Sequence, residues 1–162
     1  MSKLQFQEMI ESAFKNVMLD GGSSLLQCQA MDERCENITA EEYEKLPLQE
    51  ILDNWRIIPT HFLESHCQYM AHADAKAFRY YIPAMMRSSL SGSEEVRSEI
   101  LFYLRPSKEH WGYSMSRYSL LDDKQRSAIA QYLHWLPQIV KSDEMLHKQC
   151  ERALQNYWHQ FL

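Results

Sequence analysis

Only 14 of the 162 residues are valine, isoleucine or threonine, which is too few for a protein built on β-sheets. Glycine and proline, the residues that form tight turns, number 4 and 5. Leucine, alanine, glutamate, glutamine, methionine, lysine and arginine dominate instead, and these residues favour helices. The composition therefore predicts an all-α fold, and the chain length suits a single compact domain over residues 1–162.

Composition and cysteine spacing also restrict where such a chain functions. About 45% of the residues are hydrophobic, enough for a core, yet no window approaches the roughly 20 apolar residues that a membrane span needs. The first residues lack the basic patch and apolar run of a signal peptide. The four cysteines, at positions 28, 35, 67 and 150, form no C-x-x-C pair. We therefore expect a cytoplasmic protein with free thiols and no contact with a membrane.

The net charge of −5 is unevenly distributed along the chain. Residues 1–50 contain 10 acids and 4 bases, and most of this surplus lies between Asp32 and Glu50. Because the chain has no basic stripe, nucleic acid is an unsuitable partner. The acidic segment 32–50 is either a solvated face or a surface that binds a basic protein.

Hydrophobic periodicity and capping residues predict about seven helices, several of them short. Thr39 and Glu42 form a capping-box pattern, Asp74 suits an N-cap, and Asp122 opens a helix. Ser91 and Glu94 have the capping-box spacing at the start of another helix. Pro83 should interrupt one helix and Pro137 should end another. Helical patterns occur in ten segments, and because several of them are short, we set the number of helices at about seven. The segments are 3–19, 25–35, 39–47, 48–55, 60–66, 74–82, 84–87, 95–104, 122–137 and 142–159, with 106–119 irregular.

The last predicted helix carries an apolar stripe that ends in Leu154, Tyr157, Trp158 and Phe161. Such a stripe packs either against the rest of the chain or across a homodimer interface. We expect packing within the chain, which leaves a monomer or a homodimer as the oligomeric state.

Arg79 is the most informative charged residue, because it stands between Phe78 and Tyr80 in the most apolar segment. A covered guanidinium needs a partner, since an unpaired buried charge is strongly destabilising. Our preferred interpretation is an internal clamp, with Arg79 bonded to backbone carbonyls or to an acid such as Asp53. The alternative is an anion-binding cleft formed by Trp55, Arg79 and Tyr80.

The sequence assigns no catalytic residue, metal or cofactor. His61, His66 and Asp74 lie close in sequence, but His61 and His66 are five residues apart and would point in different directions on one helix. No nucleophile motif and no glycine-rich phosphate loop is present. A small metal-dependent hydrolase that uses these three residues is the remaining enzyme hypothesis.

Two motifs carry a family resemblance: Trp55-Arg56-Ile57-Ile58-Pro59 and Phe78-Arg79-Tyr80-Tyr81-Ile82-Pro83-Ala84. They resemble the W-x-x-I-P and F-R-[FY]-Y-[LI]-P-A elements of an uncharacterised bacterial family, a domain of unknown function. The resemblance covers about residues 8–137 and implies no activity. We therefore predict a non-catalytic cytoplasmic binding or regulatory protein. The alternative is an immunity- or antitoxin-like protein that binds a basic partner through segment 32–50.

Overall fold

The computed structural model describes residues 1–33 and 36–162, and all regular structure in these ranges is helical. This confirms the all-α fold class. The described residues form nine α-helices and four short 3₁₀ helices, more than the seven or so expected. The expected end of the second helix near Cys35 lies outside the described residues. The elements are α1 (Lys3–Ala13), α2 (Leu25–Glu33), α3 (Ala40–Lys45), η1 (Leu46–Gln49), η2 (Trp55–Ile57), α4 (Thr60–His66), η3 (Cys67–His72), α5 (Ala75–Leu90), α6 (Glu94–Tyr103), α7 (Trp111–Tyr118), α8 (Asp123–Ile139), α9 (Glu144–Asn156) and η4 (Trp158–Phe161).

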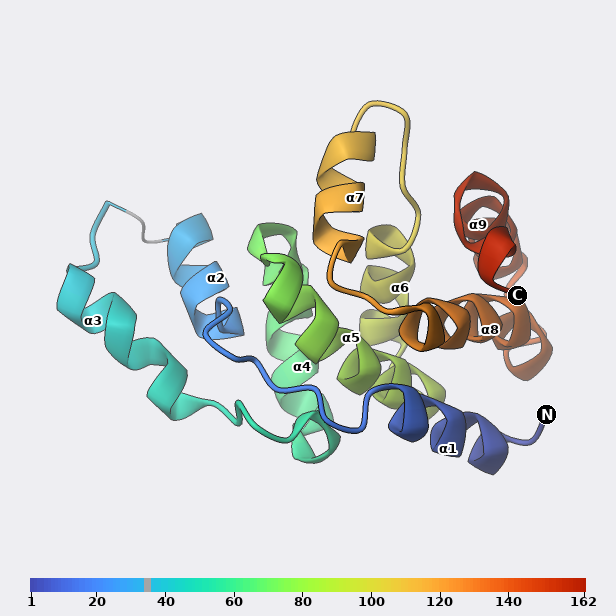
Figure 1. The fold of residues 1–162 in the computed structure, drawn as a ribbon, viewed down its shortest axis with the longest axis horizontal. Helices are drawn as coiled ribbons and strands as arrows, with labels where there is room; N and C mark the ends of the chain where they lie inside the picture. Colours follow the sequence, from blue (N-terminus) through green and yellow to red (C-terminus); the bar gives the residue numbers. More distant parts are fainter. Residues whose placement is uncertain (34–35) are drawn as a thin grey trace.

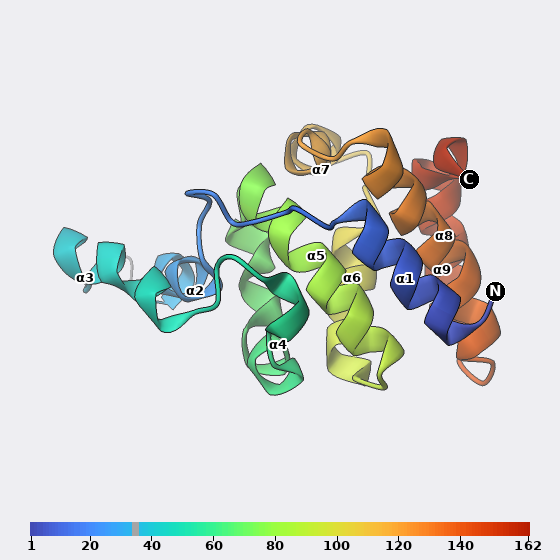
Figure 2. The same cartoon turned by 60° about the horizontal axis from the view of Figure 1, so that its bottom comes forward.

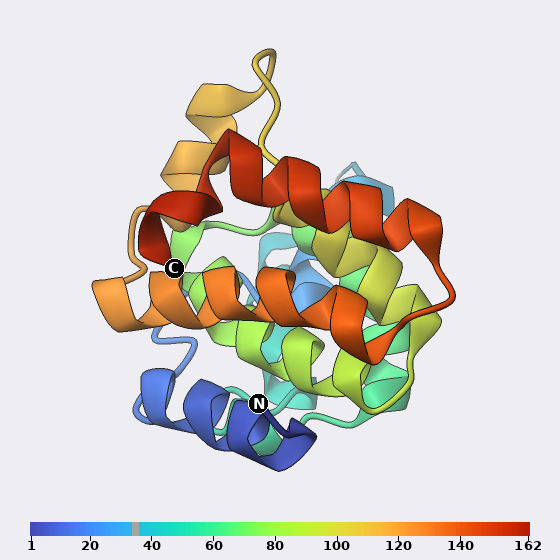
Figure 3. The ribbon, with the colours of Figure 1, turned by 90° about the vertical axis from the view of Figure 1, so that its right-hand side faces the viewer.

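Helix α5 lies at the centre of the molecule, with its neighbours arranged around it (Figure 1). Twelve of its sixteen residues are buried, so it lacks the wide polar face of a surface helix. Helices α1 and α6 pack against α5, and α8 packs against α1. Helix α9 covers α8 and also contacts α6 (Figure 3). At the end of the molecule away from both termini, α2 and α3 extend from this bundle (Figure 2).

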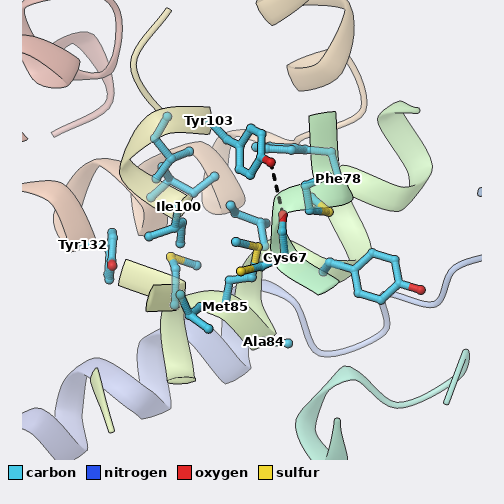
Figure 4. Close-up of a cluster of buried hydrophobic side chains, with 14 of the residues drawn as sticks. Cys67, Phe78, Ala84, Met85, Ile100, Tyr103 and Tyr132 are labelled. Carbon is cyan, nitrogen blue, oxygen red and sulfur yellow. Dashed lines mark hydrogen bonds between the residues drawn. The ribbon is translucent and has the colours of Figure 1, made fainter. Parts of the chain in front are cut away.

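A cluster of buried side chains fills the space between α5 and its neighbours (Figure 4). The hydroxyl of Tyr103 lies at the edge of this cluster and donates to the carbonyl of Cys67 at 3.1 Å, which satisfies a polar group inside an apolar region. The cluster therefore joins α6 to η3 as well as to α5. Its members include Phe78 and Met85 of α5, Ile100 of α6 and Tyr132 of α8.

Two prolines that were expected to break helices lie inside them. Helix α5 continues through Pro83 to Leu90, and α8 continues through Pro137 to Ile139, so both predicted boundaries were wrong. A proline inside a helix removes one backbone hydrogen bond and costs about 3 kcal/mol. In α5 the burial of Pro83 and of the residues on either side of it offsets that loss.

Helix α7 lies within residues 106–119, which were expected to be irregular. Its sequence has no side-chain N-cap and contains a glycine, so local signals are weak. Tertiary contacts hold it instead: the guanidinium of the buried Arg117 lies 4.6 Å from the ring centre of Tyr113 and 5.1 Å from that of Tyr103. Conversely, no α-helix covers the described residues 48–55, where η1 ends at Gln49 and η2 begins at Trp55. Of the apolar face expected there, Trp55 is buried and Ile51 and Leu52 pack on the core, but Leu48 is 82% exposed.

The first helix ends at Ala13 rather than near residue 19, and the Trp55-Arg56 pair binds carbonyls of its last turn and of the residues after it. The indole Nε1 of Trp55 donates to the carbonyl of Phe14 at 2.9 Å. The guanidinium of Arg56 donates to the carbonyls of Glu11 and Lys15 at 3.3 and 3.2 Å. The W-x-x-I-P motif therefore caps the C-terminus of α1, where carbonyls otherwise lack partners.

The C-terminal stripe packs within the chain, as expected. Trp158 is fully buried, and its Nε1 donates to the carbonyl of Leu104 at 2.7 Å. The buried residues of α9 are Leu146, Cys150 and Ala153.

The segment before α2 packs directly on the first turn of α5. Asp20 and Gly21 have φ values of 50° and 77°, a left-handed turn that glycine adopts easily and aspartate tolerates. A Cβ atom at Gly22 would lie 2.7 Å from Cβ of Lys76 and 2.9 Å from the backbone nitrogen of Ala77. Only a glycine therefore lets this segment approach α5 so closely.

Replacing Gly22 by alanine should lower the free energy of unfolding by about 1–3 kcal/mol, the usual effect of overpacking. Gly112 is the matched control, because a Cβ there meets nothing within 4 Å and the residue is helical. Gly112→Ala should raise stability by up to about 1 kcal/mol through helix propensity. Urea denaturation of both variants measures the difference, and equal midpoints would contradict this account of the turn.

Candidate functional site

Helix α3 and η1 stand apart from the core, and none of their residues is buried. Figures 1 and 2 show α3 beyond α2, at the far end from the termini. We call residues 25–33 and 36–50 the acidic arm. Its exposed helix is nevertheless well formed: Thr39 and Glu42 make the predicted capping box, and Lys45 pairs with Glu41 at 2.5 Å.

The arm is strongly negative. Within its described residues, Lys45 is the one basic side chain, set against seven carboxylates. Asp32 pairs with His72 at 2.9 Å, and Glu33 accepts a hydrogen bond from the hydroxyl of Tyr69. The seven acids are Asp32, Glu33, Glu36, Glu41, Glu42, Glu44 and Glu50, of which all but Glu50 are exposed.

A shallow apolar groove lies between α2 and α3, with a volume of about 380 Å³. Met31, on the α2 side, is 41% exposed, and Ile38 and Tyr43 are half-buried. Burial raises the pKa of the Tyr43 hydroxyl, which stays protonated and neutral at physiological pH. The groove thus offers an apolar floor beside carboxylates. It is lined by Ala30, Met31, Ile38, Thr39, Ala40, Tyr43 and Glu44.

Glu50 fixes the arm to the core. Its carboxylate accepts from the backbone nitrogens of Leu25 and Leu26 at 3.3 and 2.9 Å, and so caps the N-terminus of α2. The buried hydroxyl of Tyr81 donates to the same carboxylate at 2.7 Å. Burial, together with the charge of Glu50, raises the pKa of Tyr81. The last acid of segment 32–50 is therefore structural, while the others face solvent.

The structure does not bring Trp55, Arg79 and Tyr80 to one cleft. Trp55 and Tyr80 are fully buried, and the hydroxyl of Tyr80 donates to the carbonyl of Ile51 at 2.7 Å. Trp55 borders a small pocket of about 120 Å³ with Glu11 and Arg87. Arg79 lines a different pocket, of about 270 Å³. A binding role for the three residues together stays a prediction that this arrangement does not support.

Among residues 1–33 and 36–162, Arg79 makes one hydrogen bond, and its partner differs from those expected. Its Nε donates to Oε1 of Gln125 at 3.0 Å rather than to a backbone carbonyl or to Asp53. Gln125 is buried, and its Nε2 donates to the carbonyl of Ala13 at 3.3 Å. Arg79 thereby joins α5 to α8 and to the end of α1, while the rest of its guanidinium faces the pocket.

The clamp that we expected at Arg79 exists two turns later, at Arg87. The guanidinium of Arg87 donates to the carbonyl of Arg56 and, at 2.6 Å, to that of Ile58. Arg87 therefore ties α5 to the W-x-x-I-P motif, and burial lowers its pKa. Sequence reasoning missed this residue, although an arginine directly after Met85-Met86 in an apolar helix was a usable signal.

The three residues of the hydrolase hypothesis have separate structural surroundings. Asp74 caps α5, accepting from the backbone nitrogen of Ala77 at 2.8 Å. His66 contacts the carbonyl of Phe62 at 2.8 Å, and His61 borders a pocket that contains neither of the other two. Among residues 1–33 and 36–162, no group of three or more histidine, cysteine or acidic side chains could hold a metal ion.

The described cysteines, Cys28, Cys67 and Cys150, are buried free thiols. Burial raises the pKa of each to about 12. A thiol with such a pKa is protonated at neutral pH and is a poor nucleophile. These cysteines act as small hydrophobic side chains, as expected; Cys35 lies outside the described residues.

Fold and surface together define an all-helical protein whose candidate site is a groove on an acidic arm. The family model described as "Family of unknown function (DUF6714)" matches residues 2–162, so the chain belongs to this family. The match includes the last helix, which lay outside the resemblance of the two motifs. No curated protein and no solved structure matches the chain significantly. Within the described residues, no helix has the length and apolar character needed to cross a membrane.

Proposed function

We propose that the protein is a non-catalytic cytoplasmic binding module, and that its acidic arm binds a basic segment of another protein. One observation carries the proposal: the α3–η1 half of the arm buries none of its residues, yet it is a capped helix beside an apolar groove. Because α3 contributes no buried residue to the core, contact with a partner protein explains why this helix is formed.

The charge of the arm favours a cationic partner. Among the described residues of the arm, six exposed carboxylates and Lys45 produce a negative potential that attracts lysine and arginine side chains. Pairs between exposed charges contribute little affinity, about 0–1 kcal/mol each. They act mainly on association rate and on partner choice.

The groove supplies the apolar contact that the charges lack. An amphipathic helix of the partner, with an apolar face toward Met31 and Tyr43 and lysines on either side, satisfies both features. Leu48 of η1, 82% exposed, is a further apolar side chain on the arm, outside the lining of the groove. A basic amphipathic segment is thus the partner chemistry that the arm fits.

Binding of a synthetic helical peptide of leucine and lysine tests the proposal, with dissociation constants measured by isothermal titration calorimetry. We expect a complex that weakens as salt is added, because exposed charges are screened over about 10 Å at 0.1 M salt. Replacing the leucines of the peptide by glutamine, or its lysines by glutamate, should abolish binding.

Charge reversal locates the site. Glu41→Lys with Glu44→Lys should weaken binding by about tenfold or more, equivalent to roughly 1.4 kcal/mol. The control pair Glu109→Lys with Glu151→Lys changes the net charge equally at exposed positions outside the arm and should have little effect. Met31→Gln should weaken binding more than Met145→Gln, an exposed methionine on α9. Equal loss in arm and control variants, or no binding of the peptide, would refute the proposal.

A further inference from the structure

A second pocket, of about 270 Å³, lies between the segment that follows α1 and the first turns of α5. Lys76 and Arg79, three residues apart on α5, line one side of it. Asn16, Asp20 and Leu120 line the others. The pocket shares no residue with the groove of the acidic arm, so the inference that follows is independent of the proposed function.

The two cations have hydrogen-bond donors left over. A guanidinium has five N–H donors, and Arg79 uses only Nε, toward Gln125, among the described residues. An ammonium has three, and Lys76 uses one, toward the carbonyl of Asp20 at 2.8 Å. Arg79 lines the pocket, and neither of its Nη atoms is among the fully buried side-chain nitrogens without a partner.

The carboxylates near Lys76 and Arg79 do not pair with these two cations. Asp20 lines the pocket, yet no carboxylate of the described residues lies within 4.0 Å of the charged nitrogens of Lys76 or Arg79. Asp74 is engaged with Ser23 and with the first turn of α5, and Asp122 caps α8. Lys76 is the second residue of α5, where the helix dipole disfavours positive charge.

We propose that this pocket binds a phosphate group, free or as the monoester of a small metabolite, between Lys76 and Arg79. A phosphate carries about −1.5 to −2 charges and three acceptor oxygens, which matches two cations with several open donors better than a carboxylate does. The Nε contact with the buried Gln125 holds the guanidinium in place, and the contact with Asp20 holds the ammonium. The site is therefore largely preformed, which lowers the entropy lost on binding.

Calorimetric titration with inorganic phosphate, and separately with glycerol 3-phosphate, tests the site at an ionic strength kept constant with chloride. Arg79→Gln and Lys76→Gln should each weaken binding by about tenfold or more, since hydrogen bonds to charged groups are the strong ones. Lys148→Gln removes the same charge from an exposed position on α9 and should bind as wild type does. Asp20→Asn should bind more tightly, because it removes the one carboxylate that lines the pocket.

Tighter binding of the monoester would identify a phosphorylated metabolite as the ligand, and equal or weaker binding would identify the free anion. Circular dichroism establishes that each variant is folded. Should Arg79→Gln unfold, Lys76→Gln decides, because Lys76 is exposed and its ammonium makes one hydrogen bond among the described residues. No binding of either phosphate compound at millimolar concentration, or wild-type affinity in Lys76→Gln, would overturn the proposal.

Discussion

Replacing Phe78 by alanine is expected to lower the free energy of unfolding by about 3–5 kcal/mol, a large share of the total stability of a domain of this size. Phe78 is fully buried on the central helix α5. Its ring centre lies 5.3 Å from that of Tyr118, and the Arg117 guanidinium lies 5.9 Å from it. The substitution therefore leaves a cavity where α5 meets α7, in addition to the lost transfer free energy.

Urea denaturation measures this change, and Phe102→Ala is its control. Phe102 is the same residue type on the neighbouring helix α6, but it is 63% exposed, so its loss should change stability by less than about 0.5 kcal/mol. A Phe78→Ala variant as stable as Phe102→Ala would mean that α5 is not the centre of the core. The midpoint should shift without a large change in the slope of the unfolding transition.

The parts of the fold that local chemistry specifies were predictable from the sequence. Thr39 and Asp74 act as N-caps where the pattern placed them, and Asp122 caps the helix that it was expected to open, because a side-chain oxygen can satisfy the first free nitrogens of a helix. At α6 the cap is Ser93 rather than Ser91. Phe78, Tyr81, Ile82 and Met85 are all buried, as their helical spacing indicated. In these places, the residues of one short segment are enough to predict the local structure.

The parts that depend on distant residues were not predictable in the same way. Pro83 stays inside α5 because the packing of the entire helix offsets one lost hydrogen bond. Helix α7 forms because Arg117 is held among rings from α6 and α7. The early end of α1 depends on Trp55 and Arg56, some forty residues along the chain. Each of these outcomes follows from a contact that only the folded chain creates.

Each candidate site likewise has a part that the sequence indicated and a part that only the folded chain creates. The excess of acids over 32–50 was visible in the sequence, but the groove beside Tyr43 arises only from the packing of α2 against α3. Arg79 was correctly singled out as an unusual charge, whereas its neighbours in space were not those suggested. Lys76, the second cation of that pocket, gave no signal, because an exposed lysine on a helix is ordinary.

Replacing Trp158 by alanine is expected to cost about 3–5 kcal/mol, because this residue anchors the C-terminal end of the chain. The indole is fully buried, lies 4.8 Å from the ring centre of Tyr118, and donates from Nε1 to the carbonyl of Leu104 at 2.7 Å. Trp158→Phe keeps an aromatic ring but leaves that carbonyl without its donor, so it should cost less, about 1–3 kcal/mol.

Thermal unfolding at several protein concentrations separates packing within the chain from packing across a dimer, since only a dimer gives a concentration-dependent melting temperature. We expect Trp158→Ala to lower the melting temperature strongly and by the same amount at every protein concentration. A wild-type melting temperature for Trp158→Ala would contradict the packing of Trp158 against the core.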